Sequence, residues 1–283
     1  MVDSTNNEAS LQPYRLSRAV YLLPAKGGNV GLCAGKDGAL LVDVPQATEV
    51  TRIQACLVGL DPGPLRFLVN THAHADHVAG NAILGEQMPI IAHANVRKRL
   101  MVDQKITVGV KAVGHAQTPA ALPRLVFDHE MTLYLNGEEI RFVHFPQGHS
   151  DSDAMVWFWD AGVVHLGDIF WPGVFPFIDV ENGGSVEGLI ENVGKLIESL
   201  PADVKIIPGH GPVSNIQGLK EYHRMLVEST DWIRKQGQDK KYFEDIYRAF
   251  PKGWQTWGQG YISSAAWTEI VLYSYGMRKA DNA

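Results

Sequence analysis

The feature that most constrains the fold is a dense cluster of histidines and one aspartate directly after an apolar segment. Three of the chain's 11 histidines fall in the stretch Thr71-His72-Ala73-His74-Ala75-Asp76-His77. The preceding segment, Arg66–Asn70, predicts a buried strand, and alternation along extended backbone would point residues 72, 74 and 76 the same way. His77, at the start of an expected helix, would turn in from another side. Converging imidazole and carboxylate groups suit zinc, iron or manganese, so the fold must keep this strand end accessible to a metal ion.

Three later segments repeat the arrangement, because each places a histidine or an aspartate after an apolar run and beside small residues. They are Phe145–Asp151 with His149, His165–Phe170 with Asp168, and Ile207–Pro212 with His210. A neighbouring glycine lets the backbone turn tightly, and catalytic groups concentrate on loops at the ends of strands. Together the four segments predict one metal site built from distant parts of the chain.

The order of the expected elements predicts an α/β protein. Short β-type segments at 19–23, 30–34 and 39–44 precede alternating helices and strands, including one helix at about 77–84, and a similar pattern runs from 132 to 207. Asn136-Gly137 predicts a tight hairpin, and a last helix should begin after Ser263 or Ser264 and end at Gly276. Two β-rich halves, each with its own helices, indicate two sheets packed face to face with helices outside.

Composition excludes several function classes. The net charge of −6 disfavours nucleic-acid and anionic-membrane partners, which require a basic surface. Two cysteines, Cys33 and Cys56, exclude a disulfide scaffold or a Cys-rich zinc module. No apolar stretch is long enough for a membrane helix, and the polar start lacks the features of a signal peptide. We therefore expect a soluble, cytoplasmic protein with a small-molecule substrate.

The four motifs, in this order, resemble those of the metallo-β-lactamase superfamily. The resemblance covers residues 18–213 and implies an αββα sandwich with the metal site at one edge. Outside this region, the residue pattern predicts a tail at 1–17 and a helical C-terminal extension at 214–283 that packs on the main domain. Carried over position by position, the resemblance implies one metal held by His72, His74 and His149, a second held by Asp76, His77 and His210, and Asp168 bridging the two.

The resemblance also indicates a reaction. Two metal ions, expected to be zinc although iron or manganese also suits these ligands, would supply a metal-bound hydroxide that attacks an ester-like carbonyl. The substrate would be a thioester, lactone, ester or strained amide, and Asp76 would orient the nucleophile and shuttle a proton. Dedicated β-lactamases of the family usually carry Cys or Ser at the position of Asp168, so β-lactam hydrolysis is expected to be weak. An iron-dependent persulfide dioxygenase with one metal on His72, His149 and Asp168 is the alternative, and a non-catalytic metal-binding module is a third reading.

Other residues receive weaker predictions. Trp171, Phe175 and Phe177 follow Asp168 closely and are expected to form an apolar wall of the substrate pocket. His144 and His165 lie inside β-type runs and are interpreted as core histidines with satisfied hydrogen bonds. The segments 103–125 and 171–184 carry little periodicity, and their role, like the oligomeric state, is left open.

Overall fold

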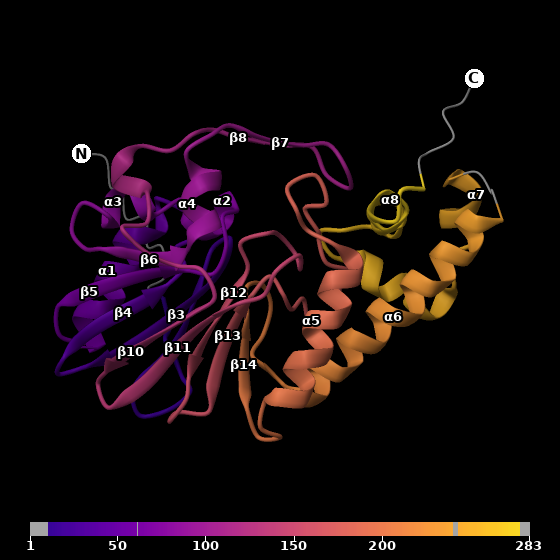
Figure 1. Cartoon of the computed structure of the whole chain (residues 1–283). Coiled ribbons are helices and arrows are strands. Elements are labelled where there is room, and N and C mark those ends of the chain that lie inside the picture. The colour runs from indigo at the N-terminus through magenta and orange to yellow at the C-terminus, as the bar shows by residue number, and fades with distance from the viewer. Residues whose placement is uncertain (1–10, 61, 240–242, 278–283) are drawn as a thin grey trace, which may run out of the picture.

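Two β-sheets lie face to face and helices cover both outer sides, as the computed structural model shows for residues 11–60, 62–239 and 243–277 (Figure 1). This is the αββα sandwich expected from the element order. The hairpin expected at Asn136-Gly137 is present, with φ of 56° and 78° at these two residues, between strands paired as Leu135↔Glu138. Positive φ at both central positions is what a tight hairpin turn requires.

The first sheet has seven strands in the order β1-β2-β3-β4-β5-β6-β9. Strands β1 to β4 are antiparallel neighbours, whereas β4, β5, β6 and β9 run parallel. Their bounds are Tyr14–Arg15, Val20–Ala25, Gly28–Gly35, Gly38–Val42, Leu65–Asn70, Ile90–His93 and Leu125–Phe127.

The second sheet has six strands in the order β10-β11-β12-β13-β14-β15, and only β13 and β14 run parallel. Their bounds are Glu130–Leu135, Glu138–His144, Ala154–Phe158, Val163–Gly167, Lys205–Pro208 and Ser214–Asn215. Strands β7 (Gln104–Ile106) and β8 (Ala112–Gly114) form a separate hairpin outside both sheets.

The apolar core has three layers, because side chains of the central strands alternate between two buried faces. In β4, Leu40 and Val42 pack between the sheets, whereas Ala39 and Leu41 pack outward. Leu41 meets Ile53 of α1, which covers the first sheet. A side-chain period of two with both faces buried explains the unbroken apolar run of this strand.

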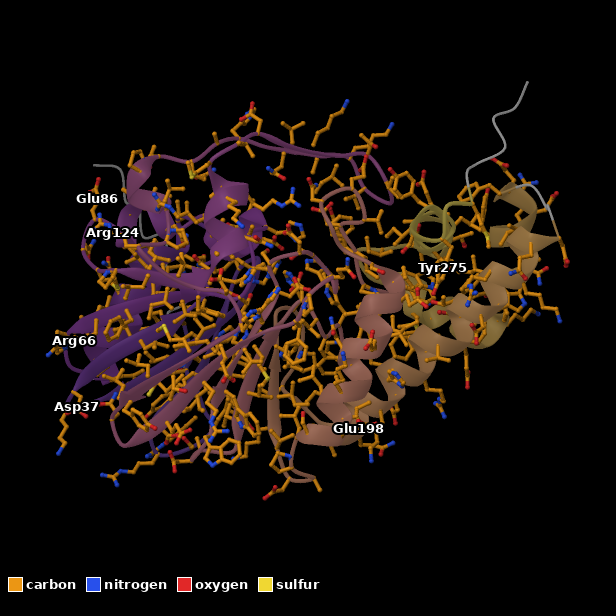
Figure 2. All side chains as sticks on the ribbon, viewed as in Figure 1. Asp37, Arg66, Glu86, Arg124, Glu198 and Tyr275 are labelled. Carbon is orange, nitrogen blue, oxygen red and sulfur yellow. The ribbon has the colours of Figure 1, made fainter. Side chains whose placement is uncertain are left out.

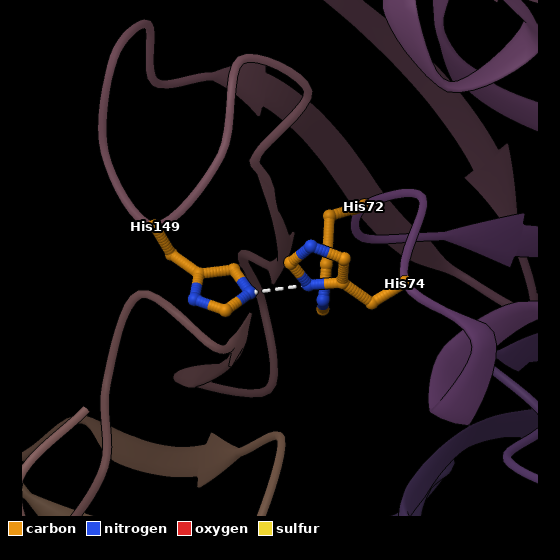
Figure 3. A group of neighbouring side chains, drawn as sticks. All are labelled: His72, His74 and His149. Carbon is orange, nitrogen blue, oxygen red and sulfur yellow. Dashed lines mark hydrogen bonds between the residues drawn. The ribbon is translucent and has the colours of Figure 1, made fainter. Parts of the chain in front are cut away.

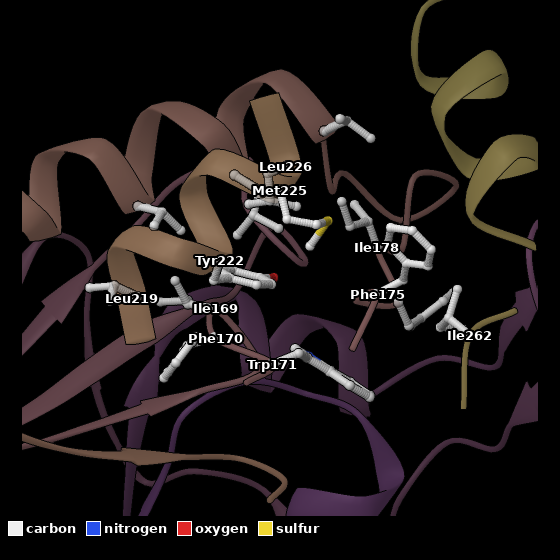
Figure 4. Close-up of a cluster of buried hydrophobic side chains, with 14 of the residues drawn as sticks. Ile169, Phe170, Trp171, Phe175, Ile178, Leu219, Tyr222, Met225, Leu226 and Ile262 are labelled. Carbon is white, nitrogen blue, oxygen red and sulfur yellow. The ribbon is translucent and has the colours of Figure 1, made fainter. Parts of the chain in front are cut away.

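Three helices cover the second sheet through a large aromatic-rich cluster that includes Phe175, Tyr222 and Trp267 (Figure 4). These helices are α5 (Val186–Ser199), α6 (Ile216–Gln238) and α8 (Ser264–Ser274). The remaining helices are α1 (Glu49–Leu60), α2 (Ala75–Val78), α3 (Asn81–Leu84), α4 (Ala94–Leu100), η1 (Pro119–Ala121), α7 (Phe243–Arg248) and η2 (Lys252–Gln259). As expected, Ser263 caps α8, and Gly276 follows it with φ of +68°.

One expectation about local structure was wrong, and one segment without visible periodicity proved to contain regular structure. The single helix expected at about 77–84 is the pair α2 and α3, broken at Gly80, whose N–H donates to the carbonyl of Val44. A Cβ at this glycine would lie 2.2 Å from Val44 Cγ1, so the close approach of this turn to the segment after β4 requires glycine. The segment 103–125, which had no visible periodicity, contains the β7–β8 hairpin and η1.

The described residues contain no helix that is both long and apolar enough to cross a bilayer. Residues 1–10 of the expected N-terminal tail lie outside the described residues, and Tyr14–Arg15 of the same segment pair with β2. The domain boundaries at 17/18 and 213/214 remain predictions.

Candidate metal centre

All seven expected ligands lie just beyond strand ends at one edge of the sandwich. His72, His74, Asp76 and His77 follow β5 of the first sheet, and Asp168 and His210 follow β13 and β14 of the second. His149 lies in the connection between β11 and β12. Because β13 and β14 are parallel, their carboxyl ends reach the same edge, where they face the end of β5.

The first ligand group consists of His72, His74 and His149, which approach one another from both sheets (Figure 3). Their ligand-capable nitrogens all lie within 4.8 Å of one another, and His74 Nδ1 is 2.7 Å from His149 Nε2. Three imidazole nitrogens at this spacing suit one divalent ion.

The second group consists of Asp76, His77, Asp168 and His210, whose ligand-capable atoms also lie within 4.8 Å of one another. His210 Nε2 is 3.1 Å from Asp76 Oδ2 and 3.5 Å from Asp168 Oδ2, and His77 Nε2 is 3.2 Å from Asp168 Oδ1. Strict alternation would have placed Asp76 beside His72 and His74. The backbone becomes helical at Ala75, however, so Asp76 turns toward the second group.

Asp168 reaches both groups. Its Oδ2 lies 3.9 Å from His72 Nε2 and 3.7 Å from His149 Nε2, in addition to its contacts with the second group. The Cβ of an alanine at position 209 would lie 1.9 Å from Asp168 Oδ1. Glycine in Pro208-Gly209-His210 is therefore required for close approach of the backbone to this carboxylate.

The donor set fits divalent metal ions by an observation independent of the resemblance. Among the described residues, several buried polar atoms that face this centre have no hydrogen-bond partner: His72 Nε2, His77 Nε2, His210 Nε2 and Asp168 Oδ1. An unpaired buried polar group is costly, and groups left this way in a folded protein require an explanation. Coordination of a divalent ion by these nitrogens and oxygens supplies one.

The outer ring nitrogens of four ligands are held by neighbouring groups. Asp43 Oδ2 lies 2.8 Å from His77 Nδ1, Asp179 Oδ2 lies 3.0 Å from His74 Nε2, and the Phe177 carbonyl accepts from His149 Nδ1 at 2.7 Å. Thr71 Oγ1 lies 3.0 Å from His72 Nδ1. Such contacts fix the tautomer that leaves the inner nitrogen free for a metal.

Asp43 and Asp179 were not predicted from the sequence. Each directly follows an apolar run, Leu40-Leu41-Val42 and Phe177-Ile178, so each carries the same local pattern as Asp168. Neither aspartate was predicted because, unlike Asp168, neither has a histidine or glycine directly beside it in the sequence.

Charge within the centre is balanced by proton placement on the histidines. Burial alone would lower the pKa of His210, but Asp168 and Asp76 outweigh it and raise this pKa to about 9. Burial likewise would raise the pKa of Asp168, yet His77 and His210 hold it well below its usual value. In His149 burial prevails and lowers the pKa to about 4. Metal binding at the second group must therefore displace protons from His77 and His210.

A cavity of about 690 Å³ opens onto the ligands. Trp171 and Phe177 line it. Phe175 was expected to line it as well, but it lies in the aromatic-rich cluster (Figure 4), where it is fully buried. Its ring stacks on Trp267 with ring centroids 5.4 Å apart. The chain turns at Gly173, whose φ is +75°, and the Phe175 N–H then donates to the Trp257 carbonyl at 2.9 Å, which holds Phe175 against the C-terminal part of the chain. Both segments whose role was open, 103–125 and 171–184, contribute to the wall.

The histidines assigned to packing, His144 and His165, belong to neither ligand group. His144 stacks on His93 with centroids 3.6 Å apart, and its Nδ1 donates to the Asp153 carbonyl. His165 is buried, and its Nδ1 accepts from the Gly167 N–H. Its Nε2 has no partner among the described residues, so only half of its expected hydrogen-bonding is met.

Several known proteins are similar to this chain in sequence. A family model described as the metallo-beta-lactamase superfamily matches residues 23–210. A probable metallo-hydrolase, YqgX of Bacillus subtilis (strain 168), is 27% identical over 156 residues, or 54% of this chain and 71% of the relative. An uncharacterized protein of Aquifex aeolicus (strain VF5) is 25% identical over 143 residues, or 50% of this chain and 66% of that protein.

Three solved structures share the fold. A metallo-beta-lactamase from Pontibacter korlensis has a TM-score of 0.60 at 15% identity and covers 77% of this chain and 99% of its own. The DIM-1 metallo-beta-lactamase has a TM-score of 0.61 at 18% identity, covering 78% and 98%. A double mutant of the sec-alkyl sulfatase PisA1 reaches a TM-score of 0.74 at 12% identity, covering 96% of this chain and 51% of that one.

Proposed function

The chain belongs to the metallo-beta-lactamase superfamily, and from this premise we propose that it is a dinuclear zinc hydrolase acting on a small ester-like carbonyl compound. The substrate class is a thioester, lactone, ester or strained amide. The observation that carries the proposal is Asp168, a buried carboxylate shared by two ligand groups that together offer five imidazoles and two carboxylates.

His72, His74 and His149 would hold one ion, Asp76, His77 and His210 the other, and Asp168 both. Neutral imidazole and carboxylate ligands favour zinc, and manganese or iron also accepts them. When bound, the ions supply Lewis-acid polarisation of the substrate oxygen and make a water molecule acidic enough to act near neutral pH.

The remaining chemistry depends on side chains of the chain itself. Asp76 is 47% exposed and lines the cavity, whereas Asp168 is 3% exposed. The carboxylate of Asp76 is therefore placed to accept a proton from the attacking water and to release it to solvent or to the leaving group. Trp171 and Phe177 give the cavity apolar walls beside the ligands, which exclude competing water from the reacting carbonyl.

A mononuclear iron dioxygenase is the second candidate, and one specific observation favours it. His72, His149 and Asp168 form a group of two histidines and one carboxylate, with Asp168 Oδ2 within 3.9 Å of both Nε2 atoms. Two histidines and a carboxylate with open positions are typical of non-haem iron oxygenases. β-Lactam hydrolysis is kept as a minor activity of the proposed hydrolase.

Metal content separates these candidates. Protein purified without added metal is examined by elemental analysis and then assayed on thioesters, lactones, esters and β-lactams. Two zinc or manganese ions per chain and turnover of at least one ester-like substrate support the hydrolase. One iron per chain and oxygen uptake with a persulfide support the dioxygenase, and a full metal complement without turnover on any substrate supports a binding module.

Two variants test the assignment of Asp168. Asp168→Ala is expected to lose at least one metal ion and most of the activity. His144→Gln is the matched control, because His144 is a half-buried histidine that belongs to neither ligand group and should leave metal content unchanged. Retention of both ions and the full rate in Asp168→Ala would exclude a bridging role.

We also propose that residues 18–213 form the metal-binding domain and that 214–283 are an extension packed on it. The family match ends at residue 210, and α6 packs on α5 through buried residues such as Leu226.

A further inference from the structure

The cavity beyond the metal ligands has a wall built by the β7–β8 hairpin. Ile106 and Ala112 lie opposite each other in the two strands and both line the cavity, together with Val110 at the connecting turn. Figure 1 shows the hairpin crossing above the ligand edge, from the α4 side toward α8, and Figure 2 shows its side chains along this crossing. Val174 and Tyr261 line the cavity as well, from the segment after Asp168 and from the segment before α8.

The hairpin is fixed in place by the segment that also supports His74. The Glu181 carboxylate accepts from Thr107 Oγ1 at 2.7 Å and from the Val108 N–H at 3.0 Å. Glu181 lies two residues after Asp179, which contacts His74. The apolar wall is therefore preformed relative to the ligands, which lowers the entropy cost of binding an apolar group.

The same wall offers no available positive charge. Arg99 is the only lysine or arginine among the described residues that line the cavity. Its guanidinium is engaged by the Asp151 carboxylate, with Nη2 at 2.8 Å from Oδ2, and by the carbonyl and side chain of Asn182. His115 lies at the exposed rim, 3.7 Å from Asp103 Oδ1.

We propose that the part of the substrate beyond the reacting carbonyl is an uncharged hydrocarbon chain or ring that lies under the β7–β8 hairpin. This inference rests on the proposed hydrolase function and narrows its substrate class. An apolar group gains free energy in proportion to the area it buries, whereas a carboxylate there would lose hydration without gaining a cation. Substrates with distal carboxylates, such as peptide-like thioesters, are disfavoured for the same reason.

The test compares three p-nitrophenyl esters on the metal-loaded protein: the acetate, the hexanoate and the monoester of adipic acid. The last two have equal chain length and differ by a terminal carboxylate. We expect kcat/KM for the hexanoate to exceed that for the adipate monoester by at least ~10-fold. This ratio measures how much more tightly the enzyme binds the transition state of the uncharged ester.

Variants of the hairpin locate the effect. Ala112→Asp adds a negative charge at an exposed position of the wall, and it should lower kcat/KM for the hexanoate by a larger factor than kcat/KM for the acetate. Ala112→Arg should instead raise the activity on the adipate monoester relative to the hexanoate. Lys105→Ala is the matched control: it changes the net charge by the same amount as Ala112→Asp, in the same hairpin, at a residue outside the cavity lining.

The outcomes separate this inference from the proposed function. Metal-dependent hydrolysis of the acetate with equal or better use of the adipate monoester would overturn the inference and leave the hydrolase in place. Absence of hydrolysis of all three esters would contradict the hydrolase instead. Binding of methyl hexanoate and monomethyl adipate, followed by tryptophan fluorescence, then applies the same comparison without turnover, and tighter binding of the adipate would overturn the inference.

Discussion

Replacing Asp43 by asparagine should remove one metal ion without unfolding the protein. Asp43 is 1% exposed, and its carboxylate contacts the Thr71 N–H, the Thr71 hydroxyl and His77 Nδ1 at 2.7 to 2.8 Å. A carboxylate only accepts hydrogen bonds, so it holds a proton on His77 Nδ1 and leaves Nε2 available to a metal. An asparagine amide in the same place presents an N–H₂ group to Nδ1, which forces the proton onto Nε2.

The expected changes in stability and metal affinity follow from the properties that asparagine shares with Asp43. Asparagine keeps the volume, tolerates the backbone φ of +60° at this position, and preserves each contact with the hydrogen-bond direction reversed where needed. In the metal-free protein, however, Asp168 and Asp43 outweigh burial and raise the pKa of His77 well above its usual value, so the substitution removes one buried counter-charge from a protonated His77. The unfolding free energy of the metal-free protein should therefore fall by about 3 kcal/mol, the lower end of the cost of breaking a buried ion pair, because Asp168 remains as a partner. Metal affinity at the second group should fall by about 10- to 100-fold, as is typical when such a supporting contact is altered.

The assay is a chelator-competition titration with elemental analysis at each step. Wild-type protein should retain two ions, and Asp43→Asn should lose the second-group ion first while keeping the one on His72, His74 and His149. Asp179→Asn is the matched control, since it reverses the same kind of contact to His74 and should weaken the first group instead. Two ions of wild-type affinity in Asp43→Asn would refute the tautomer argument.

Three further changes have clear expected outcomes. Gly209→Ala places a methyl group against Asp168 and should abolish binding of the second ion, measured by elemental analysis, with the circular dichroism spectrum unchanged. Trp267→Ala removes a fully buried ring stacked on Phe175 and should lower the unfolding free energy by about 3–5 kcal/mol in urea titrations. Burial and the neighbouring imidazole lower the pKa of His93 to about 4, so its stabilising contribution is complete above its usual pKa of 6.5 and is lost as pH falls toward 4. His93→Asn should therefore flatten the decline of unfolding free energy of the metal-free protein between pH 6.5 and 4.

Each of these outcomes has a contrary result. Wild-type metal content in Gly209→Ala would mean that the turn moves freely, and a loss below about 1 kcal/mol in Trp267→Ala would mean that the helical layer repacks around the gap. An unchanged pH profile in His93→Asn would show that His93 titrates alike in the folded and unfolded states.

The convergence of the seven expected ligand side chains could be predicted because each follows an apolar segment and carries local signs, namely clustered histidines or a nearby glycine. Asp43 and Asp179 share only the first of these signs, and a carboxylate after a strand is too common to be diagnostic. Their role emerges from contacts 34 and 105 residues away along the chain. A local sequence pattern does not show which residues so far apart along the chain come into contact.

The β7–β8 hairpin and the orientation of Phe175 and Phe177 likewise could not be predicted from local sequence. The strands β7 and β8 are three residues each and lack alternation, and Glu181, which holds them, lies more than 70 residues along the chain. In Phe175-Pro176-Phe177 both aromatics looked equally suited to the pocket. Phe175 is held away from the ligands by contacts with Trp257 and Trp267, which are more than 80 residues away along the chain and are not visible in the local sequence.

The distribution of the ligands over both sheets links metal concentration to cohesion of the fold. Metal ions held by ligands that follow β5 in one sheet and β13 and β14 in the other would act as removable cross-links between the two layers. A ligand that binds only the folded state adds about 2.7 kcal/mol of stability when its free concentration is 100 times its Kd. Metal supply would thus set the lifetime of the folded chain against proteolysis as well as its capacity for catalysis.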